Sequence, residues 1–418
     1  MTEIIRNVRG MRDLLDRESR KKLSIETEAR QLALNYGYQE INTPIVEYSS
    51  VFNKSLGQFS DIVTKEMYNF KDEKGRSLTL RPEATASIAR AIVSNGLLGS
   101  EEYRIPLKFF LFGPMFRYER PQKGRYRQFY QINFESFGKP SPECDVELIS
   151  LAFNFLKKVK SDTYLKINSL GDAKSRTRYK NELINYLKKF KKDLSSDSIT
   201  RLDKNPLRIL DSKEKGDLEI VKKAPKMFDH LSIDSNEYYK EVKSLLKSLN
   251  IKFEEDSNLV RGLDYYKETV FEFKTDKLGQ QQDTILGGGR YSGLVKMFGG
   301  NDLDGAGWAA GIDRLIDTSP LIQPLNPKIS IVYDEKYKNQ AFKLANKLRN
   351  YKKMNGNVEI VYEGSISKQI KKASKLGSKN IIIVENNEEI KISGKGKKEK
   401  QNILITDINQ IVKKLNAD

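Results

Sequence analysis

The chain is poor in two residue types on which many catalytic and metal sites depend. Its 418 residues include a single cysteine, Cys144, and a single histidine, His230. One cysteine excludes an internal disulfide and a zinc site built from several cysteines, and one histidine disfavours a two-histidine metal site or a nucleophile paired with a histidine base. We interpret His230, in the charged segment FDHLSID, as an ordinary surface residue. We therefore expect no resident metal site, and chemistry that uses Arg, Glu, Gln and Tyr side chains.

Long hydrophobic runs are also absent. No uninterrupted apolar stretch approaches the roughly 18 residues that a membrane span needs. The N-terminal segment MTEIIRNVRGMRDLLDRE carries acidic residues early and lacks the apolar core of a secretory signal. These absences predict a cytoplasmic protein that does not associate with membranes.

Positive charge is abundant. The formal net charge is +18, and the segment from Asn326 to the end holds 20 Lys and Arg residues against 10 Asp and Glu residues. Such an excess favours a polyanionic partner. A generally lysine-rich composition explains the excess about as well, so charge alone is weak support for nucleic-acid binding.

Length and periodicity indicate two or three domains, because 418 residues are too many for one compact core. Helical spacing runs from Asp13 to Tyr36 and ends at Gly37, a residue type that favours a helix C-terminus. Five strand-like segments follow, and their short connections at Lys74-Gly75 and Gln122-Lys123-Gly124 predict an antiparallel sheet. The segments are YQEINTPIVEY, KEMYNFKD, SLTLRPE, PLKFFLFGPMFRYE and RQFYQINFESFG.

The composition changes twice further along the chain. From Gly171 to Ser257, charged residues and serine dominate and apolar residues recur at helical intervals, which indicates a helical insertion. Strand signals return in LVRGLDYYKETVFEFKT and ILGGGRYSGLV, and GAGWAAGIDRLI reads as a strand leading into a helix. After the linker TSPLIQPLNP the pattern becomes β-α-β-α-β, which implies a mixed or parallel sheet covered by helices.

The segment MFRYERPQKGRYRQFYQ carries the most informative functional signal. Arg117 and Glu119 lie two residues apart on an expected strand and so point to one face. A loop with three basic residues follows, and Phe129 stands on the return strand. The set offers charge-assisted donors to a phosphate, with an acceptor and an aromatic ring nearby. A basic hairpin alone is more often a solvated loop, so the interpretation depends on the ordered set.

This set resembles motif 2 of the class II aminoacyl-tRNA synthetases, which reads Arg-x-Glu, a variable loop and Arg-x-x-x-Phe, here Arg125 to Phe129. GYQEINTPIV resembles motif 1, the dimer-forming segment that ends in its proline, here Pro44, and GAGWAAGIDRLI resembles motif 3, with Arg314 as its arginine. RGLDYY and GGGRYSGLV resemble two signatures of the histidyl-tRNA synthetases. The alternative interpretations are core packing for the tyrosines and a tight turn for the glycines, and we expect that turn to let the backbone approach a ligand closely.

The resemblance implies a set of histidine contacts. Glu83, Thr85 and Gln131 are expected to hold the α-amino group, and Glu135 and Tyr266 the two imidazole nitrogens. An imidazole carries a nitrogen at each end of its polar edge, so a specific pocket needs an acceptor and a hydroxyl opposite each other. The complete expected histidine set is Glu83, Ala84, Thr85, Gln131, Glu135, Arg261, Tyr265 and Tyr266.

The resemblance also implies a set of ATP contacts. Arg117 is expected at the α-phosphate, Arg125 and Arg314 at the γ-phosphate, Glu119 at the adenine amino group, and Phe129 against the ring. Because the substrate carboxylate is already ionised, activation needs alignment and cations and no general base. The expected catalytic residues are Arg117 and Arg261, and Mg²⁺ is expected to bridge the β- and γ-phosphates.

The implied whole is an α+β protein. Residues 1–170 and 258–320 are expected to form a class II catalytic domain with an antiparallel sheet, and 171–257 a helical insertion domain. Residues 326–418 are expected to form an α/β anticodon-binding domain, whose surplus charge fits phosphate contact and salt-dependent binding. The implied activity joins L-histidine to tRNA(His) with ATP as a substrate, in a homodimer.

Three other functions compete with this expectation. The family includes a non-catalytic regulatory subunit of histidine biosynthesis, but such proteins lack the C-terminal domain and lose the ATP residues. A class II synthetase for threonine, proline or glycine is disfavoured by RGLDYY together with Glu135. A nucleic-acid-binding protein without catalysis would leave the arginine set unexplained.

Overall fold

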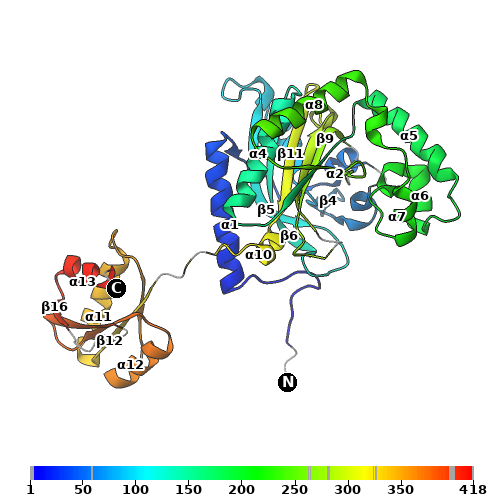
Figure 1. Ribbon diagram of the computed structural model, residues 1–418. Helices are drawn as coiled ribbons and strands as arrows, with labels where there is room; N and C mark the ends of the chain where they lie inside the picture. Colours follow the sequence, from blue (N-terminus) through cyan, green and yellow to red (C-terminus); the bar gives the residue numbers. More distant parts are fainter. Residues whose placement is uncertain are drawn as a thin grey trace. The chain divides into compact units, whose positions relative to one another are not determined.

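The chain folds into two compact units, Met1–Gln323 and Pro324–Asp418 (Figure 1). The computed structural model describes residues 4–57, 60–261, 263, 265–279, 283–322, 324, 327–394 and 401–416. None of the helices within these ranges combines the length and the apolar character that a membrane crossing needs.

An eight-stranded sheet organises the first unit, and it is antiparallel except at its two edge pairs, β1–β5 and β7–β8. The antiparallel sheet expected from the sequence is therefore confirmed. In spatial order the strands are β1 (Gln39–Glu40), β5 (Leu107–Phe116), β6 (Gln128–Gly138), β11 (Asp304–Gly311), β10 (Thr284–Tyr291), β9 (Tyr266–Lys274), β7 (Tyr164–Ser169) and β8 (Glu254–Glu255).

Not every expected strand joins this sheet. The segment YQEINTPIVEY is two short strands: β1 pairs with β5, whereas β2 (Val46–Tyr48) pairs with β4 (Ser77–Leu80) in a separate sheet. The order of that sheet is β2-β4-β3, with β3 at Tyr68–Lys71. Pro44 lies between the two pieces and has no N–H to donate to a ladder, which explains the interruption.

Helices cover both faces of the large sheet. One face packs Phe134 and Trp308 against helices that contribute Ile25, Phe155 and Leu246. These are α1 (Asp16–Asn35), α4 (Pro142–Lys158) and α8 (Ile233–Ser248), with α10 (Ile312–Thr318) beside them. The opposite face packs against α2 (Ser49–Ser55), α3 (Thr85–Ser94) and α9 (Leu294–Met297). The expected first helix is confirmed, although it begins at Asp16 and ends one residue before Tyr36.

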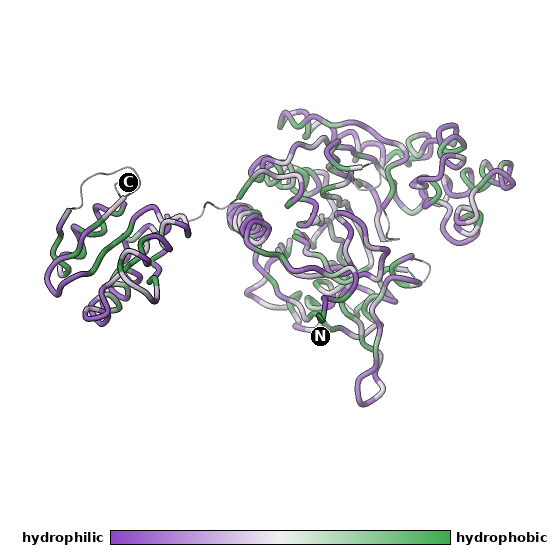
Figure 2. The backbone as a smooth tube through the Cα atoms, turned by 90° about the horizontal axis from the view of Figure 1, so that it is seen from below, coloured by the Kyte–Doolittle hydropathy of each residue, from purple (hydrophilic) through white to green (hydrophobic). Residues whose placement is uncertain are grey.

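The charged stretch after Gly171 is helical, as expected. It contains α5 (Ala173–Lys188), α6 (Ser196–Lys204), α7 (Lys215–Val221) and α8, and hydrophobic and hydrophilic residues alternate along its helices (Figure 2). Leucines of α5 and α6 share one core, whereas Tyr239, Val242 and Leu246 of α8 pack in the core that contains α4. Contacts do not separate this stretch from the rest of the first unit, so a distinct insertion domain over 171–257 stays a prediction.

The second unit has a mixed five-stranded sheet in the order β13-β12-β14-β15-β16. The first three of these strands are parallel and the last two pairings are antiparallel. The elements are β12 (Lys328–Tyr333), α11 (Lys338–Arg349), β13 (Asn357–Ile360), α12 (Ile366–Lys375), β14 (Asn380–Val384), β15 (Glu389–Gly394), β16 (Gln401–Leu404) and α13 (Ile408–Asn416). The expected β-α-β-α-β order is confirmed, and an additional hairpin and helix follow it.

Candidate active site

A cavity of about 250 Å³ opens on the α3 side of the eight-stranded sheet. Twelve of the thirteen residues expected from the sequence line it, and Ala84, which is fully buried, does not. The structure thus brings together Glu83, Thr85, Arg117, Glu119, Arg125, Phe129, Gln131, Glu135, Arg261, Tyr265, Tyr266 and Arg314.

Small residues on β10 and β11 form part of the cavity floor. Gly307 stands opposite Glu135 in the ladder, and a Cβ added at Gly307 would collide with the Glu135 carboxylate. A Cβ at Gly287 would collide with the guanidinium of Arg261. The glycines of GGGR therefore do not form the tight turn that we expected. They lie inside β10, where the absence of side chains leaves room for charged groups above the sheet.

One end of the cavity is acidic and phenolic. The Glu135 side chain is 1% exposed, and its two oxygens accept hydrogen bonds from the hydroxyls of Thr85 and Tyr291, each at 2.6 Å. Burial raises the pKa of Glu135 to about 8, because the charged form loses its water, despite these two bonds. The Tyr265 ring packs against those of Tyr266 and Tyr291, with centroids 4.8 and 5.3 Å apart.

Glu83 stands at the beginning of α3. Its two oxygens accept the backbone N–H groups of Thr85 and Ala86, at 2.7 and 2.9 Å. Burial raises the pKa of Glu83, although these hydrogen bonds and the Arg117 charge oppose the shift. Each carboxylate oxygen keeps a further lone pair, so Glu83 can accept from a ligand as well.

Strand β6 supplies a row of side chains to the cavity. Residues two apart share a face of a strand, and Phe129, Gln131, Asn133 and Glu135 all line the cavity. Arg117 lies over the Phe129 ring, 5.3 Å from its centroid. The row leads from an aromatic ring beside a cation to the buried carboxylate.

The other end of the cavity is basic. Arg314 donates to the carbonyl oxygens of Gly124 and Thr284, and Arg117 donates to the Pro82 carbonyl. Burial, together with the neighbouring Arg125 and Arg117 charges, lowers the pKa of Arg314. Arg125 forms an ion pair with Glu119. A cluster of partly buried guanidinium groups, two of them held by neutral carbonyls, is suited to a multiply charged anion.

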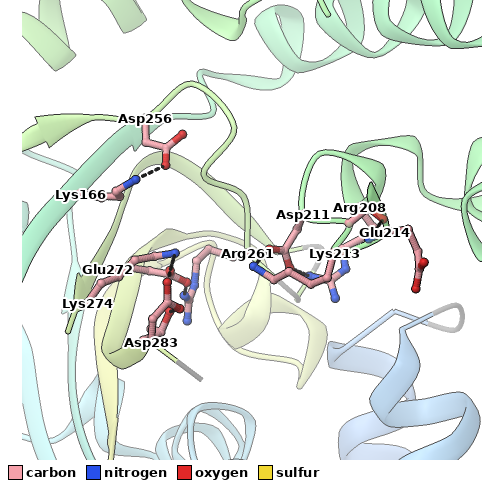
Figure 3. A network of polar contacts seen from close by, with 12 residues as sticks. Lys166, Arg208, Asp211, Lys213, Glu214, Asp256, Arg261, Glu272, Lys274 and Asp283 are labelled. Atoms are coloured by element: carbon pink, nitrogen blue, oxygen red, sulfur yellow. Dashed lines mark hydrogen bonds and ion pairs between the residues drawn. The ribbon is translucent and has the colours of Figure 1, made fainter. Parts of the chain in front are cut away.

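Arg261 belongs to a charged network of its own (Figure 3). It forms an ion pair with Glu272, whose second oxygen accepts from the Thr284 hydroxyl at 2.9 Å. Lys274 lies within 3.6 Å of Glu272 and 3.3 Å of Asp283. This network fixes the Arg261 guanidinium beside the Tyr266 ring, 5.6 Å from its centroid.

Sequence reasoning missed three side chains of the site: Tyr291, Glu272 and Asn133. Tyr291 lies in the quoted segment GGGRYSGLV, and the period of two along a strand would have placed it on the face of Gly287 and Gly289. Asn133 could have been found between Gln131 and Glu135 by the same rule. No local pattern pointed to Glu272, because its pairing with Arg261 depends on the tertiary structure.

The only histidine of the chain is not part of the cavity lining. His230 ends a short 3₁₀ turn (Met227–His230) and packs on the Tyr179 ring, with centroids 5.6 Å apart. Among the described residues, no group of three or more His, Cys, Asp or Glu side chains is placed to hold a metal ion.

The family model of histidyl-tRNA synthetases matches residues 10–315. The chain belongs to this family. A histidine–tRNA ligase of Wolbachia pipientis subsp. Culex pipiens is 45% identical over 381 residues, which cover 90% of this chain and 91% of that protein. A histidine–tRNA ligase of Rickettsia bellii is 41% identical over 422 residues and covers 99% of both chains.

Solved structures agree with the family assignment. The crystal structure of apo histidyl-tRNA synthetase from S. aureus has a TM-score of 0.80 and 32% identity, covering 98% of this chain and 100% of that one. This confirms the α+β fold class expected from the sequence. A Bacillus halodurans protein described as an ATP phosphoribosyltransferase regulatory subunit/histidyl-tRNA synthetase has a TM-score of 0.67 at 21% identity and covers 92% of this chain, which shows the shared fold alone.

Proposed function

We propose that this chain is a histidine–tRNA ligase. It activates L-histidine with ATP, giving histidyl-adenylate and pyrophosphate, and then transfers histidine to the 3′ end of tRNA(His). The observation that carries the proposal is the polarity of one cavity, which has a carboxyl and phenol end at Glu135 and Tyr266 and a guanidinium end at Arg117 and Arg314. Family membership supports the same activity.

Histidine would lie over the glycine floor. Glu83 and the Gln131 amide oxygen would accept from its ammonium group, and Glu135 and Tyr266 would bond the two imidazole nitrogens. Within the described residues the buried Gln131 Oε1 atom has no hydrogen-bond partner, which supports its availability for a ligand. An apolar amino acid of similar size would leave Glu135 and Tyr266 unsatisfied, so it would bind poorly.

ATP would occupy the guanidinium end, with adenine on Phe129 and near Glu119. A histidine carboxylate oxygen attacks the α-phosphorus, the bond from that phosphorus to the bridging oxygen of the β-phosphate breaks, and pyrophosphate leaves. Arg117 and Arg261 stabilise the charge that develops on the α-phosphoryl oxygens, and Arg125 and Arg314 hold the γ-phosphate. No step before the transfer to tRNA requires a base from the protein.

Magnesium would enter as part of the nucleotide substrate. The phosphate oxygens of ATP would supply most of the ligands of the Mg²⁺ ion, whose charge would offset part of the charge on the phosphates.

The proposal extends to the partners. Four lysines are exposed on α12: Lys368, Lys371, Lys372 and Lys375. Their exposure supports contact with the tRNA backbone by residues 326–418, as an anticodon-binding domain.

An apolar surface around the three-stranded sheet supports the proposal of a homodimer. There Ile45, Val46, Tyr48 and Phe70 are each more than two-fifths exposed. Light scattering after size-exclusion chromatography would measure the molar mass in solution, and the mass of a monomer at micromolar concentration would contradict the homodimer.

Amino-acid-dependent exchange between ATP and pyrophosphate tests the activity. With all twenty amino acids offered singly, we expect stimulation by histidine alone. Arg261→Ala should lower the exchange rate by several orders of magnitude with little change in histidine affinity, because the contact matters most in the transition state. Arg30→Ala, at a half-buried position of α1 outside the cavity lining, is the matched control and should keep full activity.

The regulatory-subunit reading predicts a different result. Such a protein would bind histidine without supporting exchange. The arginines in the cavity and the presence of the second unit favour the ligase, and absence of histidine-dependent exchange in the unaltered chain would contradict it.

A further inference from the structure

Asn133 is the middle residue of strand β6 and lines the cavity. It lies on β6 between Gln131 and Glu135, and it faces Ala309 of β11 across the ladder. The Asn133 side chain is 1% exposed, yet it lines the cavity. Alternate residues of a strand are about 6.6 Å apart, so Asn133 lies below the middle of a ligand that reaches from Gln131 to Glu135.

The amide nitrogen of Asn133 has no protein partner in the part of the chain that the structure describes. Other buried amides are paired: the Asn168 side chain donates to the Leu259 carbonyl at 2.9 Å, and that of Gln369 to the Tyr333 carbonyl at 2.9 Å. A buried donor without a partner destabilises the folded chain, because it has lost its hydrogen bonds to water. Such an unpaired group inside a cavity is suited to a bond that forms when a ligand enters.

The neighbours of Asn133 restrict what that ligand atom can be. An amide N–H₂ group donates, so its partner is an acceptor. Histidine offers two kinds of acceptor at neutral pH, one imidazole nitrogen and the two carboxylate oxygens. Glu135 and Tyr266 already bond the imidazole nitrogens, and the ammonium group is a donor, so neither is the partner of the Asn133 amide. The carboxylate of histidine is therefore the acceptor that remains for this donor.

We infer that Asn133 is a substrate contact whose amide donates a hydrogen bond to the carboxylate of the amino acid. This inference rests on the proposed function. The same oxygen becomes the carbonyl oxygen of the adenylate, which is still an acceptor, so the bond persists through activation. Asn133 would hold one carboxylate oxygen while the other attacks the α-phosphorus.

The test compares histidine with histidinol, which keeps the imidazole and the amino group but has a hydroxymethyl group in place of the carboxylate. Binding of each to the full chain is measured by calorimetry. Asn133→Ala should weaken histidine binding about tenfold or more, as expected for a bond to a charged group, and histidinol binding less than threefold. Asn133→Asp has the same shape but places an acceptor against the carboxylate. It should weaken histidine binding more than Asn133→Ala does, and it should weaken histidinol binding much less than histidine binding.

Ile132→Val is the matched control, since Ile132 lies on the same strand and packs on the opposite face of the sheet. It should leave both affinities unchanged, and melting temperatures of all variants verify folding. Equal losses for histidine and histidinol, or no loss for either, would overturn the role of Asn133 while leaving the ligase activity intact. If the unaltered chain bound no histidine and showed no exchange, the proposed function itself would fall, and the Asn133 contact with it.

Discussion

At the scale of single residues, Glu135 is the most constrained group of the cavity. Its carboxyl is buried, and the hydroxyls of Thr85 and Tyr291 hold both oxygens. Burial raises the pKa of Glu135 from its ordinary value of 4.5 to about 8. Near neutral pH the ligand-free pocket therefore favours the protonated carboxyl, and a donating or cationic imidazole would favour the ionised form.

This pKa predicts a pH dependence of stability. Between pH 4.5 and about 8 the folded chain keeps a proton on Glu135 that the unfolded chain has lost, so the free energy of unfolding falls as pH rises through this range. The slope from this residue approaches ~1.4 kcal/mol per pH unit. Glu135→Gln, which cannot ionise, should remove that component. Urea unfolding of both proteins at several pH values measures it, and identical slopes would contradict a raised pKa.

At the scale of elements, strand β10 serves two faces with alternate residues. Gly287 leaves room for Arg261 on the cavity side, whereas Arg290 points to the opposite side. There Arg290 forms an ion pair with Asp145 of α4 at 2.6 Å, with side chains only 1% and 2% exposed. The Tyr238 hydroxyl of α8 donates to the same carboxylate at 2.9 Å. The pair thus joins the cavity strand to the helices behind it.

Breaking this pair should destabilise the first unit. Asp145→Asn leaves a buried guanidinium without its counter-charge, and the free energy of unfolding should fall by about 3–5 kcal/mol. Asp162→Asn, at an 83% exposed position 3.8 Å from Lys277, is the control and should change it by less than ~0.5 kcal/mol. Urea unfolding measures both, and equal small effects would show that Arg290 finds another partner.

The elements were predictable where the local pattern decided them. The strand-like runs predicted β5 and β6, and helical spacing predicted α1 and α12. The strand expected over PLKFFLFGPMFRYE ends at Phe116, so the expectation that Arg117 and Glu119 lie on it was wrong. The prediction of a tight turn at the glycine segment was wrong, because pairing with β9 and β11 keeps Gly287–Gly289 extended in β10. A local sequence pattern does not encode such pairing between strands. The prediction of a single strand over YQEINTPIVEY was wrong, because β1 and β2 belong to different sheets.

At the scale of the whole molecule, we propose that the first unit activates the amino acid and the second unit binds the tRNA backbone. Among the residues that the structure describes, all that line the cavity belong to the first unit, and the lysines of α12 belong to the second. The second unit has its own core, which includes Ile331, Leu344 and Ile382. Changes on the surface of the second unit should therefore affect tRNA binding without affecting amino-acid activation.

Replacing Lys368, Lys371, Lys372 and Lys375 with Gln tests this division. tRNA affinity should fall, and the slope of log K against log salt should lose roughly 0.9 for each phosphate contact removed, if contacts are duplex-like. Histidine-dependent exchange should stay unchanged. The same change at four exposed lysines outside α12, Lys343, Lys347, Lys352 and Lys353, is the charge-matched control. Equal effects of both sets would contradict a specific role for α12.

The sequence by itself determined the family, the α+β class and twelve cavity residues through its resemblance to the class II motifs, whose residues keep a fixed order along the chain. Only the tertiary structure decided that Ala84 lies outside the cavity lining, that Tyr291 and Thr85 hold Glu135, and that Glu272 holds Arg261. These contacts join segments up to 156 residues apart, as for Tyr291 and Glu135. Partners at such separation are set by how strands and helices pack, which no local pattern records.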